Sequence, residues 1–159
     1  MSGTEVSDAT ATGAPVVKPG EMWIEVVTLP VGDVDRAKEF YEGLGWRLDI
    51  DFEPGPGLRG VQLTPPGSPC SIQFGVGPTP VEPGSAQPTF LVVADIEEAR
   101  AQLIERGADV SEVSYSDLDG NAGSGPDPEG RSYFSRATFS DPDGNPWVLQ
   151  QITERLPGR

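Results

Sequence analysis

The stretch LPVGDVDRAKEFYEGLGW, residues 29–46, predicts the end of a strand followed by a short capped helix. Its apolar side chains recur at helical spacing, at Val34, Ala37, Phe40, Tyr41 and Leu44. Asp33 precedes them, where a carboxylate accepts hydrogen bonds from the free N–H groups of a helix start. Gly45 follows them, and glycine is the residue that most readily closes a helix. We therefore expect a helix over residues 34–44.

Short strands flank this helix, and the same order of elements then occurs a second time. The first set of predicted strands covers residues 21–29, 46–52, 60–64 and 70–76. In the second half, a helix over residues 96–106 begins after Asp95 and ends at Gly107. The second set of predicted strands covers residues 89–93, 108–113, 134–139 and 147–152. The sequence therefore predicts an α+β protein made of two βαβββ modules.

The two halves share a motif as well as an order of elements. The pattern Leu-x-Val-x-Asp leads into each helix, at residues 29–33 and again at residues 91–95. The predicted organisation is a disordered tail over residues 1–20, a first module over 21–76, a linker over 77–87, a second module over 88–153 and a C-terminal tail over 154–159. The second module contains a long irregular stretch over residues 114–130, and a loop of this length is more often a lid or a binding loop than a connector.

The composition excludes several classes of function. The chain of 159 residues carries 25 Asp and Glu against 11 Lys and Arg, a formal net charge of −14. Such an acidic surface repels phosphate, so we expect binding neither to nucleic acid nor to a membrane. The sequence has no histidine, which excludes a Ser-His-Asp triad and histidine-based zinc or iron sites. Its single cysteine, Cys70, cannot form an internal disulfide, and we expect a cytoplasmic protein.

These patterns resemble the vicinal oxygen chelate superfamily, which includes glyoxalases, bleomycin-resistance proteins and extradiol dioxygenases. Residues 29–46 resemble the first strand-to-helix segment of that family, and FSDPDGNPWVLQ, residues 139–150, resembles its closing hairpin. The resemblance covers residues 22–153. It implies the glyoxalase/bleomycin-resistance fold, in which two βαβββ modules form cup-shaped mixed sheets. It also implies a homodimer, because the family usually closes its sheets by pairing modules.

The resemblance further implies a divalent metal held by His, Glu or Gln on the first and fourth strands of each module. Carried over position by position, these ligands fall at Val26 and Ser71 in the first half and at Pro88 and Val148 in the second. Valine and proline carry no donor atom, and a lone serine hydroxyl is a weak ligand. We therefore predict no metal and no cofactor, and the metal-dependent activities of the family lose their support.

The same positions imply which residues face the cavity, because side chains alternate along a strand. The predicted ligand-binding residues are Val26, Thr28, Gln62, Ser71, Gln73, Phe90, Arg136, Thr138, Val148 and Gln150. This lining is apolar with neutral donors and acceptors, and Arg136 is its only cation. It suits a small, fairly apolar ligand with a carbonyl or hydroxyl group. Arg136 has an equally weighted alternative as a rim residue in an ion pair, and the face of the strand over residues 46–52 stays open.

Three functions compete at this point. The first is a metal-independent binding protein of the bleomycin-resistance type that holds an apolar or aromatic metabolite or antibiotic. The second is a metal-independent isomerase, lyase or cyclase, in which Arg136 and the cavity glutamines stabilise an enolate; its catalytic residues are not identified. The third is a partner-binding subunit whose cavity is filled by its own side chains. We favour the first.

Overall fold

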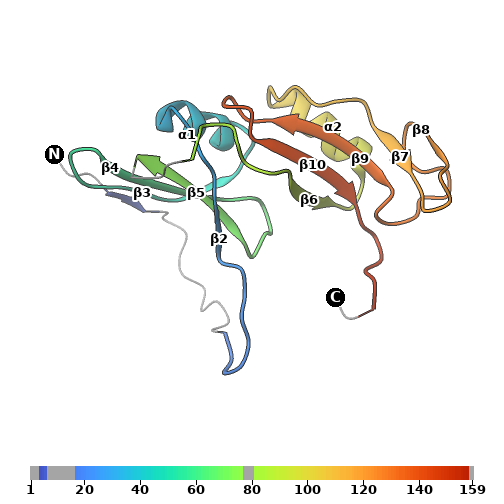
Figure 1. Cartoon of the computed structure of the whole chain (residues 1–159), viewed down its shortest axis with the longest axis horizontal. Coiled ribbons are helices and arrows are strands. Elements are labelled where there is room, and N and C mark those ends of the chain that lie inside the picture. The colour runs from blue at the N-terminus through green and yellow to red at the C-terminus, as the bar shows by residue number, and fades with distance from the viewer. Residues whose placement is uncertain (1–3, 7–16, 77–80, 158–159) are drawn as a thin grey trace. The chain divides into compact units, whose positions relative to one another are not determined.

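The computed structural model describes residues 4–6, 17–76 and 81–157 of the chain (Figure 1). The chain divides into two compact units, Met1–Pro83 and Gly84–Arg159. Each unit pairs one helix with one five-stranded sheet. This arrangement confirms the α+β fold and the repeated order of elements that the sequence predicts. In the described part of the chain, no helix has the length and apolar character that crossing a membrane requires.

The first unit contains α1 and a sheet with the strand order β1-β3-β4-β5-β2. Its elements are β1 (Thr4–Val6), β2 (Val26–Thr28), α1 (Val34–Gly43), β3 (Arg47–Gly55), β4 (Leu58–Thr64) and β5 (Ser71–Val76). β2 runs parallel to β5, and the other neighbouring strands are antiparallel. The sheet is therefore mixed, as the βαβββ pattern predicts.

Helix α1 begins where the sequence predicts and ends one residue earlier, at Gly43. The Asp33 carboxylate accepts a hydrogen bond of 3.0 Å from the Arg36 N–H, and Gly45 has a φ of +86°. The helix covers one face of the sheet, where Tyr41 is fully buried. The Tyr41 ring centroid lies 5.0 Å from that of Trp46 and 5.9 Å from that of Phe74. Because this core lies between α1 and the sheet, it does not occupy the opposite face of the sheet.

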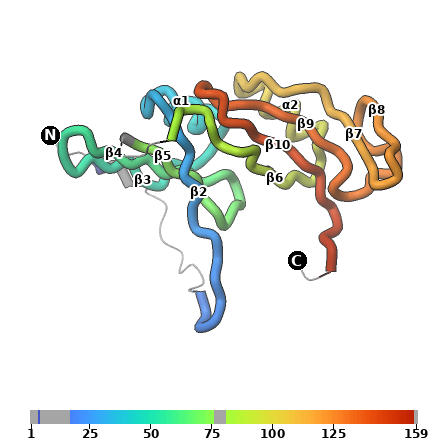
Figure 2. Tube along the Cα trace, in the orientation of Figure 1, coloured from blue at the N-terminus to red at the C-terminus, as the bar shows by residue number. Residues whose placement is uncertain are grey.

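The second unit contains α2 and a sheet with the strand order β6-β10-β9-β7-β8. Its elements are β6 (Thr89–Val93), α2 (Ile96–Glu105), β7 (Ser114–Ser116), β8 (Ala122–Ser124), β9 (Ser135–Ser140) and β10 (Pro146–Gln151). β6 runs parallel to β10, and Figure 2 shows the two strands side by side. The Asp95 carboxylate accepts 3.0 Å hydrogen bonds from the N–H groups of Glu97 and Glu98. Ile96, Trp147 and Leu149 form the centre of the core.

The strand predicted over residues 108–113 is wrong. The segment lies outside the ladder, and β7 and β8 instead form a hairpin within the stretch predicted to be a long loop. The Ser111 N–H donates to the Thr138 carbonyl at 2.8 Å, but the Thr138 N–H donates to the Ser111 side-chain oxygen at 2.9 Å. This hydroxyl takes the place of a strand carbonyl, so the ladder is not continued.

The ends of the first module also differ from the prediction. The first strand is confined to β2, since only three residues of the predicted stretch 21–29 pair with β5. Within the predicted tail, Thr4–Val6 forms β1 and pairs with β3, although residues 7–16 lie outside the described residues. This pairing closes an edge of the sheet that would otherwise leave N–H and C=O groups free.

Candidate functional site

A β-bulge in β3 decides which side chains face away from α1. Before the bulge, Leu48 pairs with Leu63, whose side chain is fully buried on the helix side. After it, Ile50 pairs with Gln62, and Phe52 pairs with Gly60. The extra residue thus moves Ile50 and Phe52 to the opposite face, as a bulge does. This settles the face of the second strand, which strict alternation along residues 46–52 leaves open.

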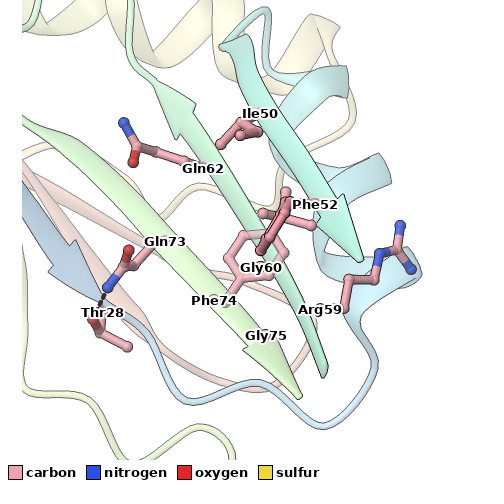
Figure 3. Close-up of a pocket in the computed structure, with 10 residues that line it drawn as sticks. Thr28, Ile50, Phe52, Arg59, Gly60, Gln62, Gln73, Phe74 and Gly75 are labelled. Atoms are coloured by element: carbon pink, nitrogen blue, oxygen red, sulfur yellow. Dashed lines mark hydrogen bonds between the residues drawn. The ribbon is translucent and has the colours of Figure 1, made fainter. Parts of the chain in front are cut away.

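On this opposite face lies a cavity of about 350 Å³ (Figure 3). It is lined by Thr28, Ile50, Phe52, Arg59, Gly60, Val61, Gln62, Gln73, Phe74 and Gly75. Its volume is at the lower end of the roughly 300–1,000 Å³ that small-molecule pockets span. The structure therefore places three of the predicted ligand-binding residues, Thr28, Gln62 and Gln73, at one cavity.

Neutral polar groups gather on one side of the cavity. The Gln73 amide nitrogen donates a 2.8 Å hydrogen bond to the Thr28 hydroxyl oxygen, drawn as a dashed line in Figure 3. Gln62 pairs with Gln73 across β4 and β5, and its side chain is half-buried. Within the described ranges, the Gln62 amide has no hydrogen-bond partner. Such an amide can both donate to and accept from a bound molecule.

Among the described lining residues, the one cation is Arg59, and its side chain directs its charge to the helix side. Its guanidinium donates to Asp51 at 2.9 and 2.7 Å and to Asp35 at 2.6 Å. Lys38 of α1 adds a 2.9 Å bond to Asp51. The hydrogen bonds from Arg59, assisted by Lys38, lower the pKa of Asp51 to about 2 against the effect of burial, and the carboxylates raise the pKa of Arg59. The other described lining residues are neutral, and the charge of Arg59 is balanced by the Asp35 and Asp51 carboxylates.

The positions that correspond to metal ligands do not fit a metal. Ser71 is buried, and its hydroxyl lies 2.6 Å from that of Thr64, which in turn donates to the Asp49 carboxylate. Val26, which pairs with Ser71, has no donor atom. Among the described residues, no three His, Cys, Asp or Glu side chains are grouped so that they could hold a metal ion. The donor set therefore gives no basis for metal chemistry at this site.

The other five predicted residues lie on the sheet of the second unit. Phe90, Val148 and Thr138 form one cross-strand row, and Arg136 and Gln150 form a second pair beside it. The ten predicted residues thus form two groups of five, one on each sheet. The Gln150 amide donates to the Tyr133 carbonyl at 2.8 Å, whereas the Arg136 side chain is exposed and forms no ion pair with any described residue.

The pairing also corrects the match between the two halves. In the first unit, Thr28, Gln73 and Gln62 form the row that corresponds to Phe90, Val148 and Thr138 in the second. Val148 therefore corresponds to Gln73, two residues along β5 from Ser71. The shift keeps the same face, because side chains alternate with a period of two. The position that then corresponds to Ser71 is Pro146, which carries no side-chain donor either.

The long stretch over residues 114–130 is held by ionic contacts at its base. Arg131 donates to Asp127 at 2.7 Å and to Asp117 at 3.3 Å, and its guanidinium lies 4.9 Å from the centroid of the Phe134 ring. These bonds lower the pKa of Asp127 to about 2, and bonds from Asn121, with a smaller contribution from Arg131, lower the pKa of Asp117. A role of this stretch in binding stays a prediction.

Seven lining residues were missed at the sequence level: Ile50, Phe52, Arg59, Gly60, Val61, Phe74 and Gly75. The first two depend on the bulge, which no residue pattern in the sequence marks. The two glycines do carry a signal, because glycine inside a predicted strand often marks the close approach of a ligand or another backbone.

Comparisons with known proteins agree with this geometry. The model of the Glyoxalase/Bleomycin resistance protein/Dioxygenase superfamily matches residues 23–149, and the chain belongs to this superfamily. No curated protein sequence matches the chain significantly.

Solved structures of the superfamily are similar over most of the chain. TnmS3, an antibiotic binding protein from Streptomyces sp. CB03234, is 32% identical with a TM-score of 0.63, over 84% of this chain and 98% of its own. A glyoxalase/bleomycin resistance protein from the same organism is 33% identical with a TM-score of 0.60, over 81% of this chain and 100% of its own. A superfamily member from Sphaerobacter thermophilus DSM 20745 is 27% identical with a TM-score of 0.59, over 83% of this chain and 98% of its own.

Proposed function

We propose that this protein is a metal-independent binding protein of the glyoxalase/bleomycin-resistance type, and that it holds an apolar or aromatic metabolite or antibiotic in the cavity on its sheet. One observation carries the proposal: among the described lining residues, the only titratable side chain is Arg59, and its guanidinium is bonded to Asp35 and Asp51. The cavity offers contact area and hydrogen bonds but no free acid or base. The similarity to TnmS3, an antibiotic binding protein, supports the same function.

The enzymatic alternative has less support. A metal-independent isomerase or lyase needs a proton acceptor within hydrogen-bond reach of its substrate. The Asp49 carboxylate on β3 is already engaged, because it accepts hydrogen bonds from Thr64 and, at 2.7 Å, from Arg47. No Asp or Glu is among the described residues that line the cavity, so the enzymatic alternative lacks a carboxylate base there.

We also propose a homodimer. Met22, Trp23 and Ile24 are consecutive apolar residues before β2, and their exposed fractions are 95%, 52% and 73%. An apolar run of this kind is typical of a surface that a partner covers. A second copy of the chain is the partner that the family resemblance implies.

Native mass spectrometry of the purified protein tests both proposals at once. We expect a dimer without metal that gains the mass of one aromatic ligand per chain or per dimer when a panel of aromatic antibiotics and polyphenols is added. A monomer would contradict the homodimer. Binding of no panel member by the wild-type protein, or turnover of a bound member, would contradict the binding function.

The variant Gln62→Ala then connects binding to the cavity. It removes an unpartnered amide, and we expect affinity for the bound panel member to fall by about 5- to 10-fold, the value of one neutral hydrogen bond. Gln102→Ala is the matched control, because Gln102 is exposed on α2 in the second unit, where it bonds Glu98. Equal affinity of the two variants would place the ligand elsewhere.

A further inference from the structure

Gly60 lies inside the central strand β4, and the fold gives no reason for a glycine there. Its φ is not positive, so its backbone suits any residue. A Cβ atom at this position would meet no atom within 4 Å. Glycine weakens a strand interior, because it loses more conformational freedom on folding and has no side chain to pack. The absence of a side chain at position 60 is therefore not explained by the stability of the fold.

Gly75, the cross-strand neighbour of Gly60 on β5, lacks a side chain for a structural reason. The two glycines are paired across the strands. A Cβ at Gly75 would overlap the backbone carbonyl oxygen of Arg59, so no side chain fits there unless the backbone shifts. Together, Gly60 and Gly75 form a patch of uncovered backbone in the cavity, which we call the glycine patch (Figure 3).

The second unit shows that this place in the sheet accepts long side chains. In the matched register, Arg136 and Gln150 stand where the first unit has Gly60 and Gly75, and they too are paired across their strands. The two sheets share the same topology around these positions. Of the two sheets, only the sheet that bears the described cavity therefore has glycine at both of these positions.

We propose that the cavity takes a flat, ring-shaped ligand whose face lies against the glycine patch; this rests on the proposed binding function. Only backbone without side chains lets a ring approach the plane of a sheet closely over its whole face. The Phe52 side chain, 43% exposed, and Ile50 flank the patch from β3 and provide apolar contact. Gln62 and Gln73 lie next along β4 and β5 and meet polar groups on the rim of the ring.

A matched pair of probes tests the shape of the ligand. 5,7,4′-Trihydroxyflavone and the corresponding flavanone carry the same hydroxyl and ketone groups, but a saturated bond puckers the flavanone ring. We expect isothermal titration calorimetry with the wild-type protein to give an affinity at least about 10-fold higher for the flavone, because the puckered ring cannot lie against the patch.

Variants of Gly60 test the position of the ligand. Gly60→Ala and Gly60→Val place one and three carbons on the patch, and we expect flavone affinity to fall by about 10-fold and by more, respectively. The same variants should raise the Tm by about 2–6 °C, because an ordinary residue replaces glycine in a strand with free space. Gly43→Ala is the control: its Cβ also meets no atom within 4 Å, and it should raise the Tm without affecting binding.

The outcomes separate this inference from the proposed function. Undiminished flavone affinity in Gly60→Val, or equal wild-type affinity for the flavone and the flavanone, overturns the inference and leaves the binding function in place. If the wild-type protein binds only puckered members of the aromatic panel, the inference is again wrong by itself. If it binds no member of the panel, the proposed function fails, and the inference fails with it.

Discussion

Replacing Asp51 by asparagine should destabilise the first unit at neutral pH and remove part of its sensitivity to acid. Asp51 is 9% exposed and accepts hydrogen bonds from Arg59 and Lys38. These bonds, chiefly those from Arg59, lower its pKa from 3.8 to about 2. At about 1.36 kcal/mol for each pH unit, the difference corresponds to roughly 2 kcal/mol of folding free energy.

The sign of the effect follows from the direction of the pKa shift. Because the folded pKa lies below the unfolded one, the carboxylate stabilises the fold well above pH 3.8, and this contribution is lost as the pH falls through about 2. Asparagine has the same shape but cannot ionise. The variant Asp51→Asn should therefore be less stable by roughly 2 kcal/mol at pH 7, and the gap should narrow in acid.

Urea unfolding followed by circular dichroism measures this difference. With a slope of about 1–3 kcal/mol per M for a small protein, we expect the urea midpoint of the first unit to fall by about 1 M at pH 7. Hydrogen exchange of peptides from β3 and β4 assigns the change to this unit. Glu53→Gln is the control, because Glu53 is exposed on the same strand. Equal midpoints for the wild type and Asp51→Asn at pH 7, or a gap that persists near pH 2, would refute the reasoning.

Three further predictions concern a helix cap, a buried turn and the thiol. Asp95→Ala removes the acceptor of the Glu97 and Glu98 N–H groups and should cost about 1 kcal/mol in a denaturant titration, whereas an unchanged midpoint would contradict the capping role. Asn145→Ala should cost about 2–3 kcal/mol by the same measurement, because the amide is 1% exposed and bridges the Ala86 N–H and the Asp141 carboxylate. Burial and the charge of Glu25 raise the pKa of Cys70, so iodoacetamide should modify it more slowly at pH 8 than it modifies the urea-unfolded chain; equal rates by intact mass would be inconsistent with this.

The helices and the main ladder could be predicted because their signals are local. Asp33 and Asp95 cap α1 and α2 as expected, and β6 has the predicted bounds. The strand over residues 108–113 was wrong for a reason that the sequence does not contain. Ala108 and Val110 alternate with exposed residues and are buried, as in a strand, but the hydroxyl of Ser111 occupies the Thr138 N–H. A pattern predicts an extended backbone, whereas a strand also needs a partner.

The candidate site was predictable in part. Alternation from the family positions found Thr28, Gln62 and Gln73, because those strands are regular around the cavity. It missed Ile50 and Phe52, because one extra residue in β3 exchanges the two faces of everything that follows. Strict alternation would have kept Leu48 and Ile50 on one face.

In a library of single substitutions, Gly60 and Gly75 should differ in which replacements they tolerate. At Gly75 the Arg59 carbonyl leaves no room for a side chain, so every replacement should lower the yield of folded protein before binding is ever tested. At Gly60 there is room, so replacements should pass a selection for expression and fail only a selection for ligand. A position that is tolerant in the first screen and intolerant in the second would identify the floor of a binding site without any knowledge of the ligand. The same comparison, applied to strand glycines in other members of this family, would distinguish glycines that the backbone geometry requires from glycines that ligand binding requires.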